Sequence, residues 1–259
     1  MSDTTTLHCL ALRTVRHSDT RDILTAWSRE RGRIAIAMPA GAGREARRRR
    51  ALAAPLALFE GEVTGRPDRD IVSMRDFSAM PGSPALAATP LKAMVASFIA
   101  EVLDHVLRRN EADAPLSDFL FGSARVLAAM PAQALPMFAP TLMFGLLHHA
   151  GVAPDLDAYR RSAIFDLRDA RFRTSPPLHG DYLEGEACRA LMALSRVHYN
   201  KLLRALADGD ITRSLGRPFF PGAAARREVL QRLIDYYGIH VCPLDTIKTL
   251  AVLREMANI

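Results

Sequence analysis

The arginines between residues 29 and 50 are the side chains that most clearly indicate chemistry. Eight arginines stand there against two acids, Glu30 and Glu45, so the surplus of six equals the net charge of the whole 259-residue chain. They flank a short alternating apolar stretch, Ile34 to Met38. Guanidinium groups bind phosphate through paired hydrogen bonds, and a local excess of them indicates a site for a polyanion. Nucleic acid is the favoured ligand, and a solvated surface or an anionic membrane are the alternatives.

Motifs of covalent catalysis are few. The sequence contains no H-E-x-x-H, no Walker loop and no G-x-S-x-G motif. Gly41–Ala46 matches the G-x-G-x-x-A dinucleotide pattern, but Pro55 leaves little room for the helix that this fingerprint requires. The adjacent pair His148-His149 points to different faces of a helix, which disfavours a shared metal. We therefore predict a protein that is not an enzyme and holds neither cofactor nor metal; a dinucleotide enzyme using Gly41–Ala46 is an alternative.

Composition indicates a folded chain with reduced thiols. Hydrophobic residues make up 49% of it, enough for a substantial core. The richest apolar run, Leu135 to Leu147, is interrupted by Pro136 and Pro140, so no membrane span is predicted. Three widely spaced cysteines and an N-terminal segment without a secretion signal indicate a cytoplasmic protein.

The first 79 residues have the pattern of short strands joined by polar turns. Five strands are predicted, at Leu7–Val15, Asp22–Trp27, Arg33–Met38, Pro55–Val63 and Ile71–Phe77. Gly32 closes the turn before the third strand, where a hairpin favours a positive φ. Five strands in so short a segment favour an OB-type barrel, which binds single strands across one face and its flanking loops. Arginines at 13–16, 29–33 and 44–50 are expected in such loops.

The rest of the chain has the pattern of helices. Residues 80–90, rich in Pro, Gly, Ser and Ala, are predicted to link a barrel domain, 1–79, to a second domain, 91–259. Helices are predicted there at about 91–107, 116–130, 136–150, 184–206, 223–237 and 245–256, the last with Asp245 as N-cap. Residues 159–182 alternate as an inserted β-ribbon. The predicted fold class is α+β: an N-terminal five-stranded OB-fold barrel, then a mainly α-helical domain with a small inserted β-ribbon.

Three parts of the chain together resemble one known protein family. The first is the run L-A-L-R-T-V-R-H-S-D-T-R-D-I-L-T-A-W-S-R-E-R-G-R, from Leu10 to Arg33. The second is L-A-A-P-L-A-L-F-E-G-E-V, after the basic run, and the third is Y-Y-G-I-H with P-L-D-T-I-K-T-L-A-V-L-R-E-M, near the far end. They are similar to the opening strands, the next barrel strand and the closing helices of the RecO family of bacterial recombination mediators. The likeness spans nearly the whole chain.

One motif of that family is altered here. Many members carry a four-cysteine zinc site that opens just after a G-x-x-P-D-L-D segment, here G-V-A-P-D-L-D at 151–157. At the positions of the two cysteine pairs this chain has Tyr159 and Ser162, then His179 and Tyr182. These side chains cannot form a thiolate zinc site. We therefore predict a ribbon without zinc, held by packing and hydrogen bonds.

The resemblance implies a mediator of DNA repair and homologous recombination that does no covalent chemistry. Members of the family bind single- and double-stranded DNA, anneal complementary strands, and bind the acidic C-terminal tail of the single-stranded DNA-binding protein. With RecR they help RecA load onto gaps. We expect the same partners here, no membrane partner, and a cytoplasmic, nucleoid-associated location. A non-catalytic protein-interaction adaptor without direct DNA binding is the alternative.

The predicted DNA-binding residues are arginines of the barrel segments: Arg13, Arg16, Arg29, Arg31, Arg33, Arg44, Arg47, Arg48, Arg49 and Arg50. If about four to six of them reach phosphates, the log–log salt slope on single strands should be about −3 to −4. Trp27 offers a base a stacking face, although core packing is the favoured interpretation. The pocket for the acidic tail is expected in the helical domain, as an apolar hollow with a basic rim.

Overall fold

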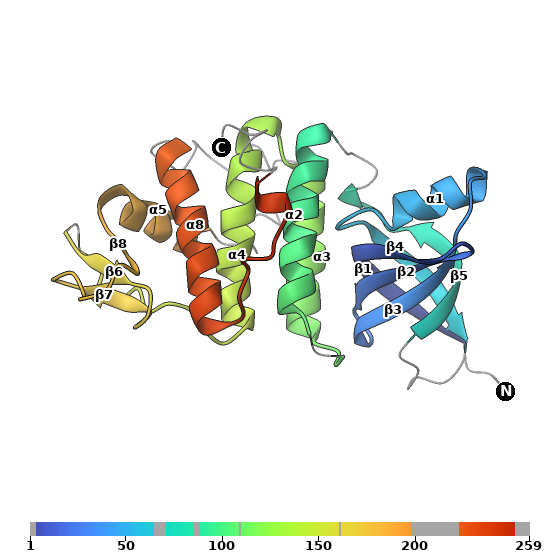
Figure 1. Ribbon diagram of the computed structural model, residues 1–259, viewed down its shortest axis with the longest axis horizontal. Coiled ribbons are helices and arrows are strands. Elements are labelled where there is room, and N and C mark those ends of the chain that lie inside the picture. Colours follow the sequence, from blue (N-terminus) through green and yellow to red (C-terminus); the bar gives the residue numbers. More distant parts are fainter. Residues whose placement is uncertain are drawn as a thin grey trace. The chain divides into compact units, whose positions relative to one another are not determined.

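The computed structural model describes residues 4–64, 71–84, 89–108, 110–160, 162–197 and 223–251. The chain divides into two compact units, Met1–Ala129 and Met130–Ile259 (Figure 1). The first unit contains a closed barrel and helices, and the second contains helices and a small three-stranded sheet. Among the described residues, no helix is long and apolar enough to cross a membrane.

The barrel of the first unit is made of β1 (Thr4–Ser18), β2 (Arg21–Ser28), β3 (Gly32–Pro39), β4 (Leu58–Thr64) and β5 (Ile71–Ala79). β1 pairs antiparallel with β2 and β4, β2 pairs antiparallel with β3, and β4 with β5. A parallel pairing of β3 with β5 closes the ring. The order β1-β2-β3-β5-β4 is that of an OB-fold, so the predicted five-stranded barrel is confirmed.

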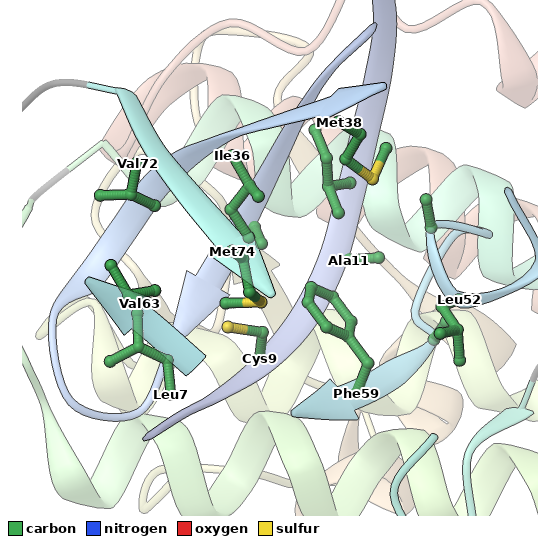
Figure 2. Close-up of a cluster of buried hydrophobic side chains, with 14 residues drawn as sticks. Leu7, Cys9, Ala11, Ile36, Met38, Leu52, Phe59, Val63, Val72 and Met74 are labelled. Atoms are coloured by element: carbon green, nitrogen blue, oxygen red, sulfur yellow. The ribbon is translucent and has the colours of Figure 1, made fainter. Parts of the chain in front are cut away.

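Alternate side chains along the strands fill the barrel, as the period of two requires. The core contains Leu7, Cys9, Ala11, Leu24, Ala26, Ile36, Met38, Phe59, Val63, Val72 and Met74 (Figure 2). Ile36 is fully buried and Met38 is nearly so, which confirms the inward face predicted for the third strand. Gly32 has a φ of +71°, and a side chain there would collide with the backbone of Glu111, so the predicted positive-φ glycine is also confirmed.

The basic segment after β3 forms a helix, α1 (Arg44–Leu52), where the sequence analysis predicted a loop. Arginine is a good helix former, and Glu45 in the first turn and Arg50 in the last suit the helix dipole. Leu52 is buried and belongs to the core cluster of the barrel. This anchor was missed because α1 has few apolar residues and therefore a weak helical period.

Two longer helices belong to the first unit, α2 (Pro90–Val106) and α3 (Ala114–Ala129). The Thr89 hydroxyl caps α2 by accepting a hydrogen bond from the backbone N–H of Lys92 at 3.3 Å. Apolar residues of both helices are buried at intervals of three and four, as the helical period predicted.

The described part of the predicted linker is bound to the barrel. Met80 N donates to Leu58 O at 3.0 Å, and Leu58 N donates to the buried hydroxyl of Ser83 at 2.9 Å. The compact units divide after Ala129, so α2 and α3 belong to the same unit as the barrel. Compact units do not test which segments fold independently, and the domain ranges 1–79 and 91–259 stay a prediction.

The helices of the second unit are α4 (Phe138–His149), α5 (Gly185–Ser195) and α8 (Ala223–His240). A 3-10 helix, η2 (Ala132–Met137), leads into α4, so the helix predicted at 136–150 starts with a tighter turn. The fully buried Tyr237 donates its hydroxyl hydrogen to Met143 O at 2.8 Å, which ties α8 to α4.

Two predicted helix boundaries are wrong in the described residues, the end of one helix and the start of another. The helix predicted at 184–206 ends at Ser195 in α5, and positions 198–206 lie outside the described residues. Asp245 lies in a turn and helix begins only at Thr249, so Asp245 is not the N-cap; positions 252–256 lie outside the described residues.

The predicted ribbon is confirmed as a three-stranded sheet in the order β7-β6-β8. Its strands are β6 (Ile164–Asp166), β7 (Arg171–Arg173) and β8 (Tyr182–Leu183). Phe165 packs edge to face against Phe172, with ring centroids 5.1 Å apart, and forms the apolar side of the ribbon.

Candidate nucleic-acid interface

Three arginines of α1 share the outward side of the helix. Arg44, Arg47 and Arg48 are spaced i, i+3 and i+4, which aligns side chains on one helix face. All three are exposed, and within the described ranges no hydrogen bond or ion pair engages their guanidinium groups. Ala46 and Leu52 are buried toward the barrel. This face holds three guanidinium forks on a rigid support, which suits binding to phosphates.

The last two arginines of the same run contact the protein. Arg49 is half-buried, and its Nε atom is buried without a hydrogen-bond partner among the described residues. Arg50 Nη2 donates to Gly41 O at 2.5 Å and so braces the turn that precedes α1. Of the four consecutive arginines, Arg47 and Arg48 can therefore meet a ligand without breaking an internal contact.

Three other predicted arginines pair with acids of α2 and α3. Arg33 Nη2 lies 2.5 Å from Asp104 Oδ1, and Arg33 Nη1 donates to two carbonyl oxygens at the end of α2. Arg13 Nε lies 2.8 Å from Asp104 Oδ2. Arg29 Nη2 lies 2.6 Å from Asp118 Oδ1. The charges of these arginines are thus partly neutralised within the first unit.

The remaining predicted residues are Arg16, in β1, and Arg31, in the turn between β2 and β3. Like Arg13, Arg16 is inside β1, which continues to Ser18, so the loop position predicted for both is wrong. Arg16 Nη2 donates to Asp19 O at 2.9 Å. Arg31 lies in the predicted turn, half-buried, with its Nη1 atom buried and unpartnered in the described structure.

Trp27 packs in the protein interior. Its ring is 2% exposed, and its Nε1 donates to Ser117 Oγ of α3 at 2.9 Å. An indole in this position cannot stack on a base without leaving α3. The favoured interpretation of Trp27 as a core residue is therefore confirmed.

Glu30, an acid within the basic window, is held by the barrel. Its Oε1 lies 2.7 Å from His8 Nδ1, and its Oε2 accepts hydrogen bonds at 2.9 Å from His8 N and from Ser28 Oγ. Burial alone would raise the pKa of Glu30, but these hydrogen bonds outweigh burial and lower the pKa. The ionised carboxylate therefore braces the turn that carries Arg29 and Arg31.

The topology of the barrel removes the dinucleotide alternative. α1 does follow β3 at Gly41–Ala46, as the pattern requires. The next strand, β4, pairs antiparallel with β1 and β5 in a closed barrel. A dinucleotide fingerprint needs a parallel β-α-β unit in an open sheet, which this segment does not form.

Sequence reasoning missed the groups that fix the barrel arginines. Asp104 is 71 residues from Arg33, and Asp118 is 89 residues from Arg29. Contacts over such separations leave no periodic signal in a single sequence. The charge count could locate the basic window, but it could not distinguish outward arginines from internally paired ones.

The positions aligned with zinc ligands make other contacts. Tyr159 packs against Phe172 with ring centroids 5.2 Å apart, and His179 Nε2 lies 3.5 Å from Asp166 Oδ1. Asp166 is 1% exposed, and its Oδ2 lies 2.9 Å from Arg173 Nε. In the part of the chain that the structure describes, no group of three or more His, Cys, Asp or Glu residues could hold a metal ion.

Known proteins resemble this chain across both units. The family described as "Recombination protein O C terminal" matches residues 88–242, from just before α2 to just after α8. The protein named DNA repair protein RecO from Phocaeicola vulgatus is 26% identical over 247 residues, 95% of this chain and 96% of that protein. The protein of that name from Porphyromonas gingivalis W83 is 28% identical over 252 residues, with the same coverage. That from Anaeromyxobacter sp. strain K is 26% identical over 237 residues, 88% of this chain and 89% of its own.

Proposed function

This chain belongs to the RecO family, whose role is DNA repair and recombination, and from this we propose that it binds single- and double-stranded DNA and anneals complementary strands. With RecR, it would help RecA load onto single-stranded gaps. The observation that carries the proposal is the outward face of α1, where Arg44, Arg47 and Arg48 project from a closed OB barrel.

Strand annealing requires phosphate neutralisation more than base reading. Two strands approach each other only when their charge repulsion is reduced, and a protein that reads bases would retain one sequence. Arginines on a helix face supply forked donors for phosphates and leave the bases free to pair. No covalent step is needed, so we propose that the protein is a mediator and not an enzyme.

Within the ten predicted arginines, α1 is proposed as the primary contact. Arg44, Arg47 and Arg48 reach a phosphate without losing an internal partner, and Arg16 is exposed on the β1–β2 hairpin. Arg29 and Arg33 would have to leave their carboxylates, which costs part of the energy gained from a phosphate. Their role is therefore proposed to be support of the barrel against α2 and α3.

The second unit is proposed to bind the acidic C-terminal tail of the single-stranded DNA-binding protein. A hollow there is lined by apolar residues of α4, the ribbon, α5 and α8, and by one cationic residue, Arg232, whose Nη1 also lies 3.3 Å from Asp235 Oδ2. Its volume of about 10 Å³ holds one water at most, so lining side chains must move before a tail residue enters. An acidic tail peptide should bind the chain, and Arg232→Ala should weaken that binding.

An annealing assay tests the function directly. Complementary oligonucleotides, bare or coated with their cognate single-stranded DNA-binding protein, should anneal faster with the wild-type chain. The triple variant Arg44→Ala/Arg47→Ala/Arg48→Ala should lose most of this acceleration and bind all sequences more weakly alike.

A matched variant distinguishes an effect of the α1 arginines from an effect of lower net charge. Arg160, Arg196 and Arg227 are exposed arginines of the second unit, and replacing them by alanine removes the same charge. This control should retain annealing. A wild-type chain that neither anneals strands nor shifts single-stranded DNA at moderate salt would instead support the protein-interaction adaptor.

A further inference from the structure

A polar pocket in the first unit lies apart from α1. It has a volume of about 380 Å³ and lies between β1, β3 and the C-terminal end of α2. Its lining residues are Arg13, Arg33, Asp104, His105, Arg108 and Asn110. None of them belongs to α1, so the pocket is a second concentration of basic groups in the same unit. We propose that this pocket binds a phosphodiester of single-stranded DNA, an inference that rests on the proposed function.

The charge of the lining favours an anion. Three arginines face one carboxylate, Asp104, which leaves a surplus of two positive charges. Arg33 is committed to the protein, because it holds Asp104 and the carbonyl oxygens at the end of α2. Arg13 is freer: its side chain is 56% exposed, and its Nε pairs with the other oxygen of Asp104 at 2.8 Å. A phosphate can thus take over Arg13 while Arg33 keeps the carboxylate in place.

Arg108 is the third arginine of the lining. Its Nε donates to His105 O at 2.9 Å, which fixes the base of the guanidinium, and its side chain is exposed. Asn110 adds an amide that can donate to a phosphate oxygen. The described residues that line the pocket include no Phe, Tyr or Trp ring and no aliphatic side chain; His105 adds an imidazole, and the rest of the lining is charged or amide, so the chemistry fits sugar and phosphate better than a base.

The surface next to the pocket can accommodate a continuous strand. Arg13 is opposite Thr25 of β2, and Thr25 is opposite Ala35 of β3. Leu24 and Ile36 point into the core, so the small side chains at 25 and 35 face outward. The row beside Arg13 therefore carries small, half-buried side chains over which a sugar–phosphate chain could pass. Together, α1 and the pocket provide separate phosphate sites, which suits a protein that holds two strands.

Two substitutions with opposite expected effects test the pocket in the full chain. Binding of a fluorescein-labelled oligothymidine is measured by anisotropy as a function of salt. Arg108→Ala should weaken binding about fivefold at low salt and reduce the salt slope by about 0.7, the value for one lost phosphate contact. Asp104→Asn removes the competing carboxylate, so it should strengthen binding and steepen the slope. A purely structural role for Asp104 would give weaker binding instead, and that result would overturn the proposal.

Control experiments distinguish DNA from other sources of phosphate, and failure of the pocket proposal from failure of the proposed function. Arg196→Ala, an exposed arginine of the second unit, should leave both quantities unchanged. ATP and inorganic phosphate should compete only as salt does; specific displacement by ATP would overturn the assignment to DNA, and so would specific displacement by an acidic peptide.

If Arg108→Ala has no effect while the triple α1 variant loses binding, the pocket proposal alone fails. If the triple variant also binds normally, the proposed function fails with it.

Discussion

The indole nitrogen of Trp27 donates a hydrogen bond to the Ser117 hydroxyl at 2.9 Å, and both residues are buried. This bond joins the outer side of β2 to α3 across 90 positions of sequence. The one aromatic side chain that could have stacked on bases from β2 is therefore part of the packing between barrel and helix. The DNA binding proposed for this barrel would therefore depend on its arginines and not on Trp27.

Ser117→Ala should destabilise the first unit by about 1–3 kcal/mol, because the buried indole N–H is left without an acceptor. Trp27 is the single tryptophan, so its fluorescence reports denaturant unfolding of this unit directly. Ser97→Ala, which removes an exposed hydroxyl bonded within α2, is the control and should change little. Strong quenching of native Trp27 fluorescence by oligothymidine would contradict the buried position.

The arginines of α1 should contribute unequally to DNA binding. Removing Arg44, Arg47 and Arg48 together should reduce the magnitude of the single-strand salt slope by about 2, at about 0.7 for each lost contact. Arg49→Ala should leave the slope unchanged and alter only thermal stability, since that residue is half-buried and its Nε atom is buried. Fluorescence anisotropy over a salt series measures both variants. Equal slope changes for Arg48→Ala and Arg49→Ala would show that the face is wrongly assigned.

The barrel was predictable because its strands carry their own pattern. Ile34, Ile36 and Met38 alternate with outward residues, and Gly32 marks the turn before them. α1 was not predictable in the same way, since most of its nine residues are arginine or alanine and its anchor, Leu52, is one apolar residue at the end. A helix whose buried side chains are one alanine, Ala46, and one leucine, Leu52, has little periodic signal.

The candidate site could be proposed from the sequence as a region but not residue by residue. Local charge excess located the basic window that contains α1, and its role in binding stays a prediction. Whether an arginine is available depends on acids brought near by folding, such as Asp104 for Arg33 and Asp118 for Arg29. Those pairings depend on tertiary structure, which composition and spacing do not contain.

Acid should remove a specific part of the stability of the first unit. The folded-state pKa of Glu30 is lowered, so its contribution is present above the ordinary glutamate range and is lost as pH falls through the lowered pKa. Glu30→Gln should therefore lower the melting temperature at neutral pH, and the difference from wild type should shrink on acidification. Glu62→Gln, at an exposed position of β4, is the control for charge. A difference that stays constant down to pH 3 would contradict this account.

The three thiols should react at very different rates. Cys9 is fully buried and burial raises its thiol pKa, while burial raises the pKa of Cys188 to about 11. Cys242 is half-buried. A disulfide reagent at neutral pH should therefore label one thiol quickly in the native chain and all three after unfolding. Cys242→Ser should abolish the fast phase; a fast phase that persists in this variant would mean that an interior thiol is accessible.

The ribbon should depend on Asp166 and not on zinc. Asp166 Oδ1 accepts hydrogen bonds from the backbone N–H groups of Arg168 and Asp169 at 2.9 and 3.2 Å, and its Oδ2 lies 2.9 Å from Arg173 Nε. Asp166→Ala leaves these donors without their buried acceptor and should cost about 3 kcal/mol, measured by thermal unfolding. The neighbouring Asp169→Ala should have a smaller effect, because that carboxylate is 37% exposed and solvent screens its ion pairs with Arg171 and Arg173. Addition of EDTA or zinc should move none of these melting curves. The turn after β6 is closed by the Asp166 carboxylate, where many other members of the family have a site of four cysteine thiolates. A wild-type melting temperature that falls with EDTA and recovers with zinc would overturn this explanation of the ribbon.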